Sequence, residues 1–313
     1  MIDEIQMCAD FEKAINSLHA KEKYDIYITG SNAFLQSSDL ATLFVGRTYE
    51  LQIFPFSFQE YLAYFPSENI YGSLTNYIRE GGMAGSYLYK NETQKYRYIN
   101  TEVLNALIVR DIMNKYKLKN EPLLHSLIDF LMDNTGNLTS IRSITDTLRS
   151  SGIGADHKTV GKYLDALCKA FAFYRIRRYD IRGKKYLHSE DKYYLVDHSF
   201  RFAHLGTKNM DYGRVLENII AIELLRRGFE LYVGVLYKKE IDFVAIRQGK
   251  KLYIQVANDI SEKETFEREV TPLLQIKDAY PKMLIARTYQ PEYQHEGITI
   301  IDAAEWLNTF PNL

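Results

Sequence analysis

The chain has 313 residues, of which 46% are hydrophobic and 25% are charged, and its formal net charge is -1. This composition excludes an intrinsically disordered chain, and the near-neutral charge excludes a uniformly basic nucleic-acid-binding coat. A chain of this length is expected to form two or three domains. No apolar run approaches membrane-spanning length, so we expect no membrane insertion. Cys8 and Cys168 lie far apart without metal-type spacing, which favours a reduced, cytoplasmic compartment.

Residues 1–55 show the alternating pattern of strand, helix, strand, helix and strand that is typical of an α/β unit, with the second helix over 40–47 and the last strand over 49–53. Asp3 and Glu4 follow its first apolar residue. In P-loop ATPases such a pair ends a strand, where the first carboxylate reaches the phosphate-bound Mg²⁺ and the second the attacking water. The run 26–28 leads into Thr29 and Asn32, which a parallel neighbouring strand would bring to the same phosphate. On spacing alone, the alternative is that Asp3 and Glu4 simply begin a helix.

The pattern becomes helical from residue 56 to about 119, with Gly81-Gly82 predicting a turn where φ can be positive. Residues 121–205 have the order of a winged helix. Three amphipathic helices are expected, the second ending at Gly152 in the C′ position and the third beginning after an Asp156 N-cap. Two strands follow, over 173–185 and 192–196, joined by a turn that serves as the wing.

Basic residues gather in this winged-helix segment. Lys158 and Lys162 lie on the outward face of the third helix, which could enter a DNA major groove. Arg182, Lys184 and Lys185 lie in the wing turn, where they would neutralise phosphates. We therefore predict DNA contact at these five residues. The alternative is that the winged helix serves only in packing or dimerisation.

Several short motifs together resemble the prokaryotic AAA-superfamily ATPases that carry a C-terminal winged helix and a restriction-endonuclease-like domain. These motifs are Asp3-Glu4-Ile5-Gln6, Thr29-Gly30-Ser31-Asn32, Gly46-Arg47, Phe56-Ser57-Phe58-Gln59-Glu60-Tyr61, Gly81-Gly82-Met83, Arg110-Asp111 and Glu240-Ile241-Asp242-Phe243. The resemblance covers the whole chain. It implies an α/β plus α+β multidomain fold, with an ATPase-core remnant at 1–55, a helical lid at 56–119, a winged helix at 120–205 and a PD-(D/E)XK-like domain at 206–313.

The resemblance implies ATP and Mg²⁺ as family cofactors, with Asp3 on the metal and Asp3, Glu4, Asn32 and Arg47 as the catalytic remnant. Arg47 corresponds to an arginine that meets a γ-phosphate across a subunit boundary; the alternative is a surface arginine. Family members carry a phosphate loop before the acidic pair, and none of the 17 glycines here opens a Gly-x4-Gly-Lys-Ser/Thr motif. We therefore expect a truncated chain that binds no ATP tightly, and that self-associates or meets a complementing ATPase fragment.

Residues 206–313 begin with a predicted helix over about 214–227, followed by strands over 231–236, 241–246 and 252–257, a helix over 263–279, and apolar runs at 283–285 and 298–301. Helix, three strands, helix and strand is the core order of restriction-endonuclease-like domains. Such nucleases need carboxylates that hold Mg²⁺ and a lysine that activates water. Glu217 and Asp242 supply acids, with Asp242 as a metal ligand, but Gln255-Val256-Ala257 replaces the usual Glu-x-Lys. Gln255 could still ligate through its amide oxygen. Lys238 and Lys239 are the first candidates for a substitute amine, and the site is expected to be degenerate.

Three classes of function therefore compete for this sequence. The first is a motor ATPase, and the second is a divergent metal-dependent nuclease. The third, which the missing motifs favour, is a non-catalytic DNA-binding or protein-interaction chain that keeps the later half of an ATPase.

Overall fold

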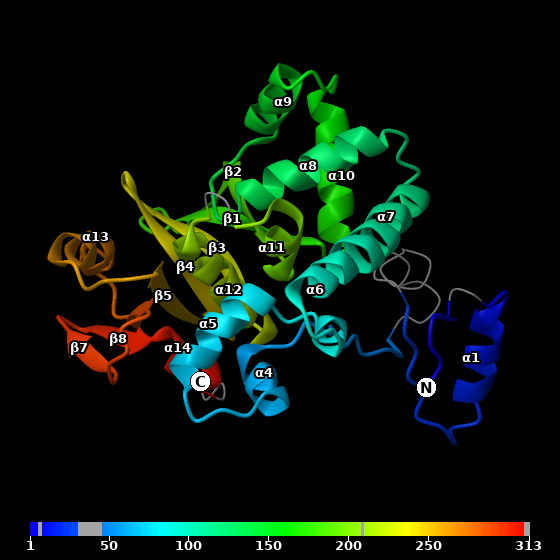
Figure 1. Cartoon of the computed structure of the whole chain (residues 1–313), viewed down its shortest axis with the longest axis horizontal. Coiled ribbons are helices and arrows are strands. Elements are labelled where there is room, and N and C mark those ends of the chain that lie inside the picture. Colours follow the sequence, from blue (N-terminus) through cyan, green and yellow to red (C-terminus); the bar gives the residue numbers. More distant parts are fainter. Residues whose placement is uncertain (6–7, 31–45, 208–209, 310–313) are drawn as a thin grey trace.

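The computed structural model describes residues 1–5, 8–30, 46–207 and 210–309 (Figure 1). It is a multidomain mixed α/β structure, built around one eight-stranded sheet with helices on both sides. Within these described ranges, no helix is long and apolar enough to cross a membrane.

The N-terminal residues form a small unit set apart from the sheet (Figure 1). It contains helix α1 (Phe11–His19) and a parallel bridge between Ile2 and Ile28, the arrangement expected of neighbouring strands. Its core consists of few side chains, with Ile5 and Phe11 buried among them. The predicted second helix and Asn32 fall largely or wholly within residues 31–45, outside the described residues.

The strand predicted at residues 49–53 does not form. These residues have no regular structure, and Leu51 and Ile53 are 63% and 88% exposed. A strand persists only where a neighbour satisfies its backbone N–H and C=O groups, and no strand of the described ranges pairs with this segment. The alternation of apolar residues was therefore a misleading signal here.

Residues 58–115 are helical, as expected. The elements are α4 (Phe58–Tyr64), α5 (Ile70–Glu80), the short helix η2 (Ala84–Leu88), α6 (Glu92–Tyr98), the π-helical η3 (Ile99–Val109) and α7 (Arg110–Lys115). Helix α4 begins with a capping box, in which Ser57 and Glu60 exchange side-chain and backbone hydrogen bonds. The predicted turn at Gly81 is confirmed, since its φ is +71° between α5 and η2.

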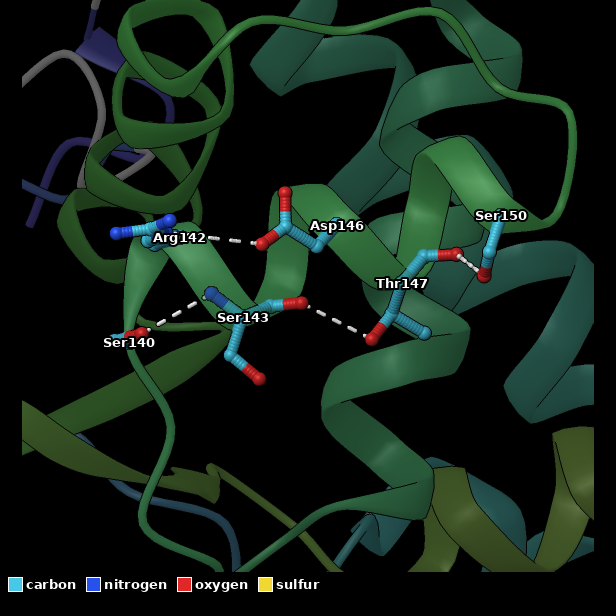
Figure 2. Close-up of a pocket in the computed structure, with 6 residues that line it drawn as sticks. All are labelled: Ser140, Arg142, Ser143, Asp146, Thr147 and Ser150. Carbon is cyan, nitrogen blue, oxygen red and sulfur yellow. Dashed lines mark hydrogen bonds and ion pairs between the residues drawn. The ribbon is translucent and has the colours of Figure 1, made fainter.

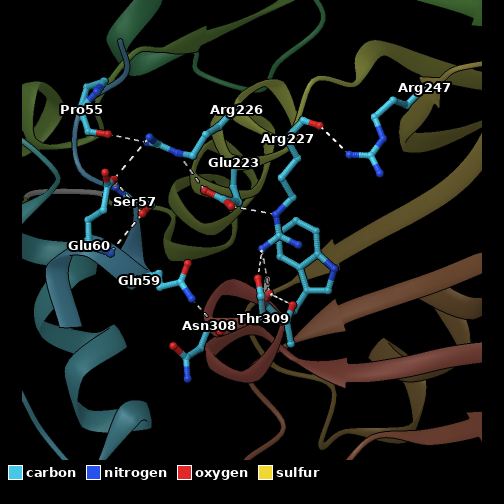
Figure 3. Close-up of polar contacts among 11 residues, drawn as sticks. Pro55, Ser57, Gln59, Glu60, Glu223, Arg226, Arg227, Arg247, Asn308 and Thr309 are labelled. Atoms are coloured by element: carbon cyan, nitrogen blue, oxygen red, sulfur yellow. Dashed lines mark hydrogen bonds and ion pairs between the residues drawn. The ribbon is translucent and has the colours of Figure 1, made fainter. Parts of the chain in front are cut away.

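An ionic network fastens the start of this helical region to the C-terminal half (Figure 3). Arg226 donates to the carbonyl of Pro55 and pairs with Glu223 at 3.0 Å. Glu223 also binds Arg227 at 2.8 Å, and the Arg227 guanidinium lies 4.1 Å from the centre of the Trp306 ring. The segment that leads into α4 is therefore held against helices of the C-terminal half.

The three helices predicted next are present as α8 (Glu121–Asp133), α9 (Ile141–Ser150) and α10 (His157–Lys169). Gly152 has a φ of +83° just after α9, and the Asp156 side chain accepts from the Thr159 N–H at 2.8 Å, so both predicted helix ends are confirmed. An antiparallel hairpin follows, made of β1 (Phe173–Asp180) and β2 (Lys185–Leu195), and then α11 (Ser199–Leu205).

The central sheet has the strand order β2-β1-β3-β4-β5-β6-β8-β7. Strand β1 pairs in parallel with β3, so the hairpin predicted as a wing continues the C-terminal sheet. Helix α12 packs on one face and α13 on the other, each over its own apolar core. The remaining elements are α12 (Tyr212–Arg226), β3 (Glu230–Leu236), β4 (Lys239–Arg247), β5 (Lys250–Ala257), α13 (Lys263–Leu274), β6 (Lys282–Ala286), β7 (Tyr293–His295), β8 (Ile298–Asp302) and α14 (Ala303–Asn308).

Candidate functional site

The two acids predicted for a nuclease-like site meet on the face of the sheet that α12 covers. Glu217 comes from α12 and Asp242 from β4, and both lie beside the ammonium of Lys192 from β2. The Lys192 Nζ is 2.8 Å from Glu217, 2.7 Å from Glu240 and 3.8 Å from Asp242. These four residues form the acidic cluster, and Lys192 is its only cation in the described part of the chain.

Strand alternation explains how a lysine comes to lie in this buried place. Lys192 is opposite Ile176 in the β1–β2 hairpin, so both side chains lie on the face that packs against α12. Tyr194, two residues further on, shares this face, and its hydroxyl donates to Glu217 at 2.6 Å. Only 3% of Lys192 remains exposed. The ammonium is therefore buried among carboxylates, and one of these, Glu217, also accepts from the Tyr194 hydroxyl.

The electrostatics of the cluster favour a charged lysine. Burial alone would lower the pKa of Lys192, but Glu217, Asp242 and Glu240 outweigh it, so the pKa is raised. Burial, followed by the charge of Glu217, raises the pKa of Asp242 well above its usual value, against the opposing effects of Lys192 and the Val256 N–H. The ammonium thus offsets part of the rise that burial and Glu217 produce in the pKa of Asp242.

Gln255 is bound on both ends of its amide. Its side-chain oxygen accepts from the backbone N–H of Asp242 at 2.8 Å, and its nitrogen donates to Glu269 at 3.0 Å. Asp242 in turn accepts from the Val256 N–H at 2.8 Å. Strands β4 and β5 are therefore joined by side-chain hydrogen bonds at the point where a nuclease would hold its metal. In the ranges 1–5, 8–30, 46–207 and 210–309, no three His, Cys, Asp or Glu side chains converge as a metal-ion site.

A groove of about 620 Å³ lies beside the cluster, between the start of α12 and the end of β5. Ala257 lines it, together with Tyr212 and Glu269. Ala257, at the position where a nuclease would carry its lysine, is itself buried in the core that α13 covers and only borders this groove. The Lys192 ammonium comes from β2 and lies on the α12 face of the sheet, whereas Ala257 belongs to the core on the α13 face.

Sequence reasoning missed Lys192, and it named Glu240 only within a motif and gave it no role in the site. It named Lys238 and Lys239 as substitute amines, but it is the Lys192 ammonium that lies among the acids. A usable signal was present, because alternation in the segment 192–196 puts Lys192 on the same face as the buried Tyr194. A lysine on the inward face of a strand requires buried acidic partners.

At the N-terminus the structure brings Asp3 and Thr29 together. The Thr29 hydroxyl donates to the Asp3 carboxylate and accepts from the Glu4 N–H at 3.2 Å. This contact follows from the parallel bridge between the two segments. Arg47 is exposed on the segment that follows residue 45. Asn32 lies outside the described residues, so its place beside Asp3 stays a prediction.

The five predicted DNA-contacting residues fall into two separate groups. Lys158 and Lys162 are exposed on α10, where they line a groove of about 500 Å³ with Tyr116 and Ile141. The other group, Arg182, Lys184 and Lys185, is exposed at the far end of the hairpin. Helix α10 packs at the Phe173 end of β1, and a strand of this length spans roughly 25 Å, so the two groups do not form one continuous patch.

A shallow polar hollow of about 440 Å³ on α9 carries no comparable site (Figure 2). Three of the hydroxyl groups that line it serve the helix itself. Ser140 caps the Ser143 N–H at 3.0 Å, Thr147 donates to the Ser143 carbonyl at 3.0 Å, and Ser150 donates to the Thr147 carbonyl at 2.7 Å. The side chains of Ser140, Thr147 and Ser150 drawn in Figure 2 are thus engaged within the helix, and Arg142 pairs with Asp146 at 3.9 Å.

Comparison with known proteins supports the assignment of the N-terminal unit. Residues 1–62 match a family described as an AAA domain, which makes this part an AAA-type ATPase-like region. Residues 71–211 match a family described as a domain of unknown function (DUF8612).

The chain is 40% identical over 314 residues to an uncharacterized protein of Haemophilus influenzae, with 98% of this chain and 76% of that protein covered. It belongs to the same family as that protein. It is also 28% identical over 283 residues to an uncharacterized protein of Methanocaldococcus jannaschii, of which it spans 62%. No solved structure matches the chain significantly.

Proposed function

We propose that this chain is the nucleic-acid-binding part of an AAA-type protein, and that its C-terminal sheet domain binds without cutting. The observation that carries the proposal is the ammonium of Lys192, which occupies the centre of the acidic cluster. A nuclease site needs at least one carboxylate free to hold a divalent cation. Here Glu217 and Glu240 are engaged directly by the Lys192 ammonium and Asp242 accepts from the Val256 N–H, while Ala257 stands at the position of the usual lysine.

Nucleic acid is the favoured partner because basic side chains gather on exposed turns although the whole chain is nearly neutral. The winged-helix reading of residues 120–205 supports the same partner. Protein interaction through the same module is the competing role. A variant that carries both Lys184→Glu and Lys185→Glu distinguishes the two roles. Loss of nucleic-acid binding in this variant favours nucleic acid as the partner.

The chain is expected to cut neither single-stranded nor duplex DNA in the presence of Mg²⁺ or Mn²⁺. Removing one group aimed at a transition-state charge costs about 2.7 to 4 kcal/mol, and both the lysine and one carboxylate of the usual set are replaced here. The measurement is the cleavage of end-labelled DNA by the purified chain beside an Asp242→Asn variant. Cleavage by the wild-type chain that disappears in this variant would contradict the proposal.

A second candidate is ATP hydrolysis, favoured by the AAA-domain match and by the contact between Thr29 and Asp3. The phosphate loop supplies most of the affinity for nucleotide phosphates, and this sequence contains no such motif. The purified chain should therefore show neither tight binding of a fluorescent ATP analogue nor turnover of MgATP. Turnover that is abolished by Glu4→Gln, with Glu12→Gln as the matched control, would instead establish the ATPase.

A further inference from the structure

Two turns lie side by side at one corner of the central sheet. The first joins β1 to β2 over residues 181–184, and the second joins β3 to β4 through Tyr237 and Lys238. The N–H of Ile181 donates to the Val235 carbonyl at 3.0 Å, so the first turn is fastened to the second hairpin. The Arg182 guanidinium lies 5.4 Å from the centre of the Tyr237 ring. Together the two turns form the paired-turn surface.

The charge of the paired-turn surface is positive, because its basic residues outnumber its two acids and each acid is already bound within the protein. Asp180 accepts from the backbone N–H groups of Arg182 at 3.1 Å and Gly183 at 3.0 Å. Glu240 is bound to the buried Lys192 at 2.7 Å. The basic residues are left toward solvent; they are Arg182, Lys184, Lys185, Lys238 and the partly exposed Lys239. Such a cluster attracts a polyanion.

Exposed aromatic rings accompany these charges. Tyr237 is 67% exposed and Tyr186 is 52% exposed, and the Tyr186 ring lies 5.0 Å from that of Tyr232. Tyr237 also has a φ of +58°, a conformation that bulky residues rarely adopt and that two-residue hairpin turns usually fill with Asn or Gly. The strained backbone presents the ring to solvent, where it gains little burial.

We propose that the paired-turn surface binds single-stranded nucleic acid, with Tyr186 and Tyr237 stacking on unpaired bases and the basic residues contacting phosphates. Exposed rings add affinity only where bases are available for stacking, which in a duplex they are not. This inference rests on the proposed nucleic-acid-binding role, but it adds a residue set and a strand preference that phosphate contacts alone do not supply. It also extends the binding surface from the predicted wing to the β3–β4 hairpin.

The test is fluorescence anisotropy of the full chain with a labelled 20-nucleotide oligo(dT) and with a 20-base-pair duplex, over a range of salt concentrations. Tyr186→Ala and Tyr237→Ala should each weaken oligo(dT) binding by about five-fold or more, since a stacked base contributes roughly 1–3 kcal/mol. Tyr237→Phe should retain the affinity because it keeps the ring. Duplex affinity should stay within two-fold in all three variants.

Two exposed residues on the N-terminal unit and its connecting segment provide matched controls, Tyr49→Ala for the rings and Lys23→Glu for the charges. Lys184→Glu with Lys185→Glu should lower the salt dependence of oligo(dT) binding, with a log–log slope smaller by about 1.4. If this pair abolishes binding while both tyrosine variants bind oligo(dT) as tightly as the wild type, stacking is overturned and nucleic-acid binding stands. If the wild-type chain binds neither ligand, the proposed function fails as well.

Discussion

Replacing Lys192 with methionine is expected to lower the free energy of unfolding by about 3–5 kcal/mol at pH 7.5. Methionine retains most of the volume but removes the ammonium that lies 2.8 Å from Glu217 and 2.7 Å from Glu240. The acids then repel one another in a site where 3% of the lysine was exposed. The loss can be measured by urea denaturation, followed by far-ultraviolet circular dichroism.

The deficit of this variant should shrink as the pH falls from 7.5 to 5. The pKa of Asp242 is already raised in the folded chain by burial and by Glu217, and Lys192 opposes that rise. Without the lysine this pKa is raised further, so the folded variant binds the proton more tightly than the folded wild type does. The unfolding free energy of the variant therefore increases more than that of the wild type as the pH falls toward the unfolded pKa. In the wild type the raised Lys192 pKa keeps its contribution intact until the pH exceeds about 10.

Two further variants separate the buried ion cluster from a general loss of charge. Lys238→Met removes an exposed lysine on the neighbouring hairpin and should change stability by no more than about 0.5 kcal/mol. Glu217→Gln introduced into Lys192→Met should recover part of the loss, because it removes one of the uncompensated charges. A deficit in Lys192→Met that is small or the same at pH 5 and 7.5 would mean that the cluster relaxes or is hydrated.

Local signals predicted the helical part of this chain well. The boundaries of α9 and α10 follow from Gly152, whose φ is positive, and from Asp156, whose carboxylate caps the third helix. These helix-end signals depend only on residues that are close in the sequence, so they do not require a particular tertiary structure. The predicted strands at 231–236, 241–246 and 252–257 likewise correspond to β3, β4 and β5.

Signals that depend on distant partners were less informative. Residues 49–53 alternate like a strand but lack a neighbour in the described chain and stay irregular. The parallel pairing of β1 with β3, which carries Lys192 to the acidic cluster, joins segments about 50 residues apart and leaves no local trace. Sequence could therefore name Glu217 and Asp242 as partners, but it could not name the cation that they share.

Gly82→Ala is expected to destabilise the chain by about 3–5 kcal/mol, although it adds one methyl group. A Cβ at this position would lie 2.2 Å from the carbonyl oxygen and 2.9 Å from the nitrogen of Phe56. These are backbone atoms, so they cannot move aside as a side-chain end can. Phe56 N–H donates to the Gly82 carbonyl at 2.8 Å, and the Gly82 N–H donates to the buried Asp197 carboxylate at 2.6 Å. Any shift that relieves the overlap weakens both bonds.

Gly161→Ala is the matched control for this substitution, with an opposite expected sign. Gly161 lies within α10, where alanine is about 0.8–1.0 kcal/mol more favourable than glycine, and the nearest atom to an added Cβ is the Ile141 side-chain methyl at 3.4 Å. The free energy of unfolding of both variants can be measured by thermal and urea denaturation. Gly161→Ala then reports on a helix position, and Gly82→Ala reports on the junction formed by residues 56, 82 and 197. If Gly82→Ala unfolds with a loss below about 1 kcal/mol, the segment 54–56 is free to move away from Asp197, and the junction does not hold the helical region to the sheet.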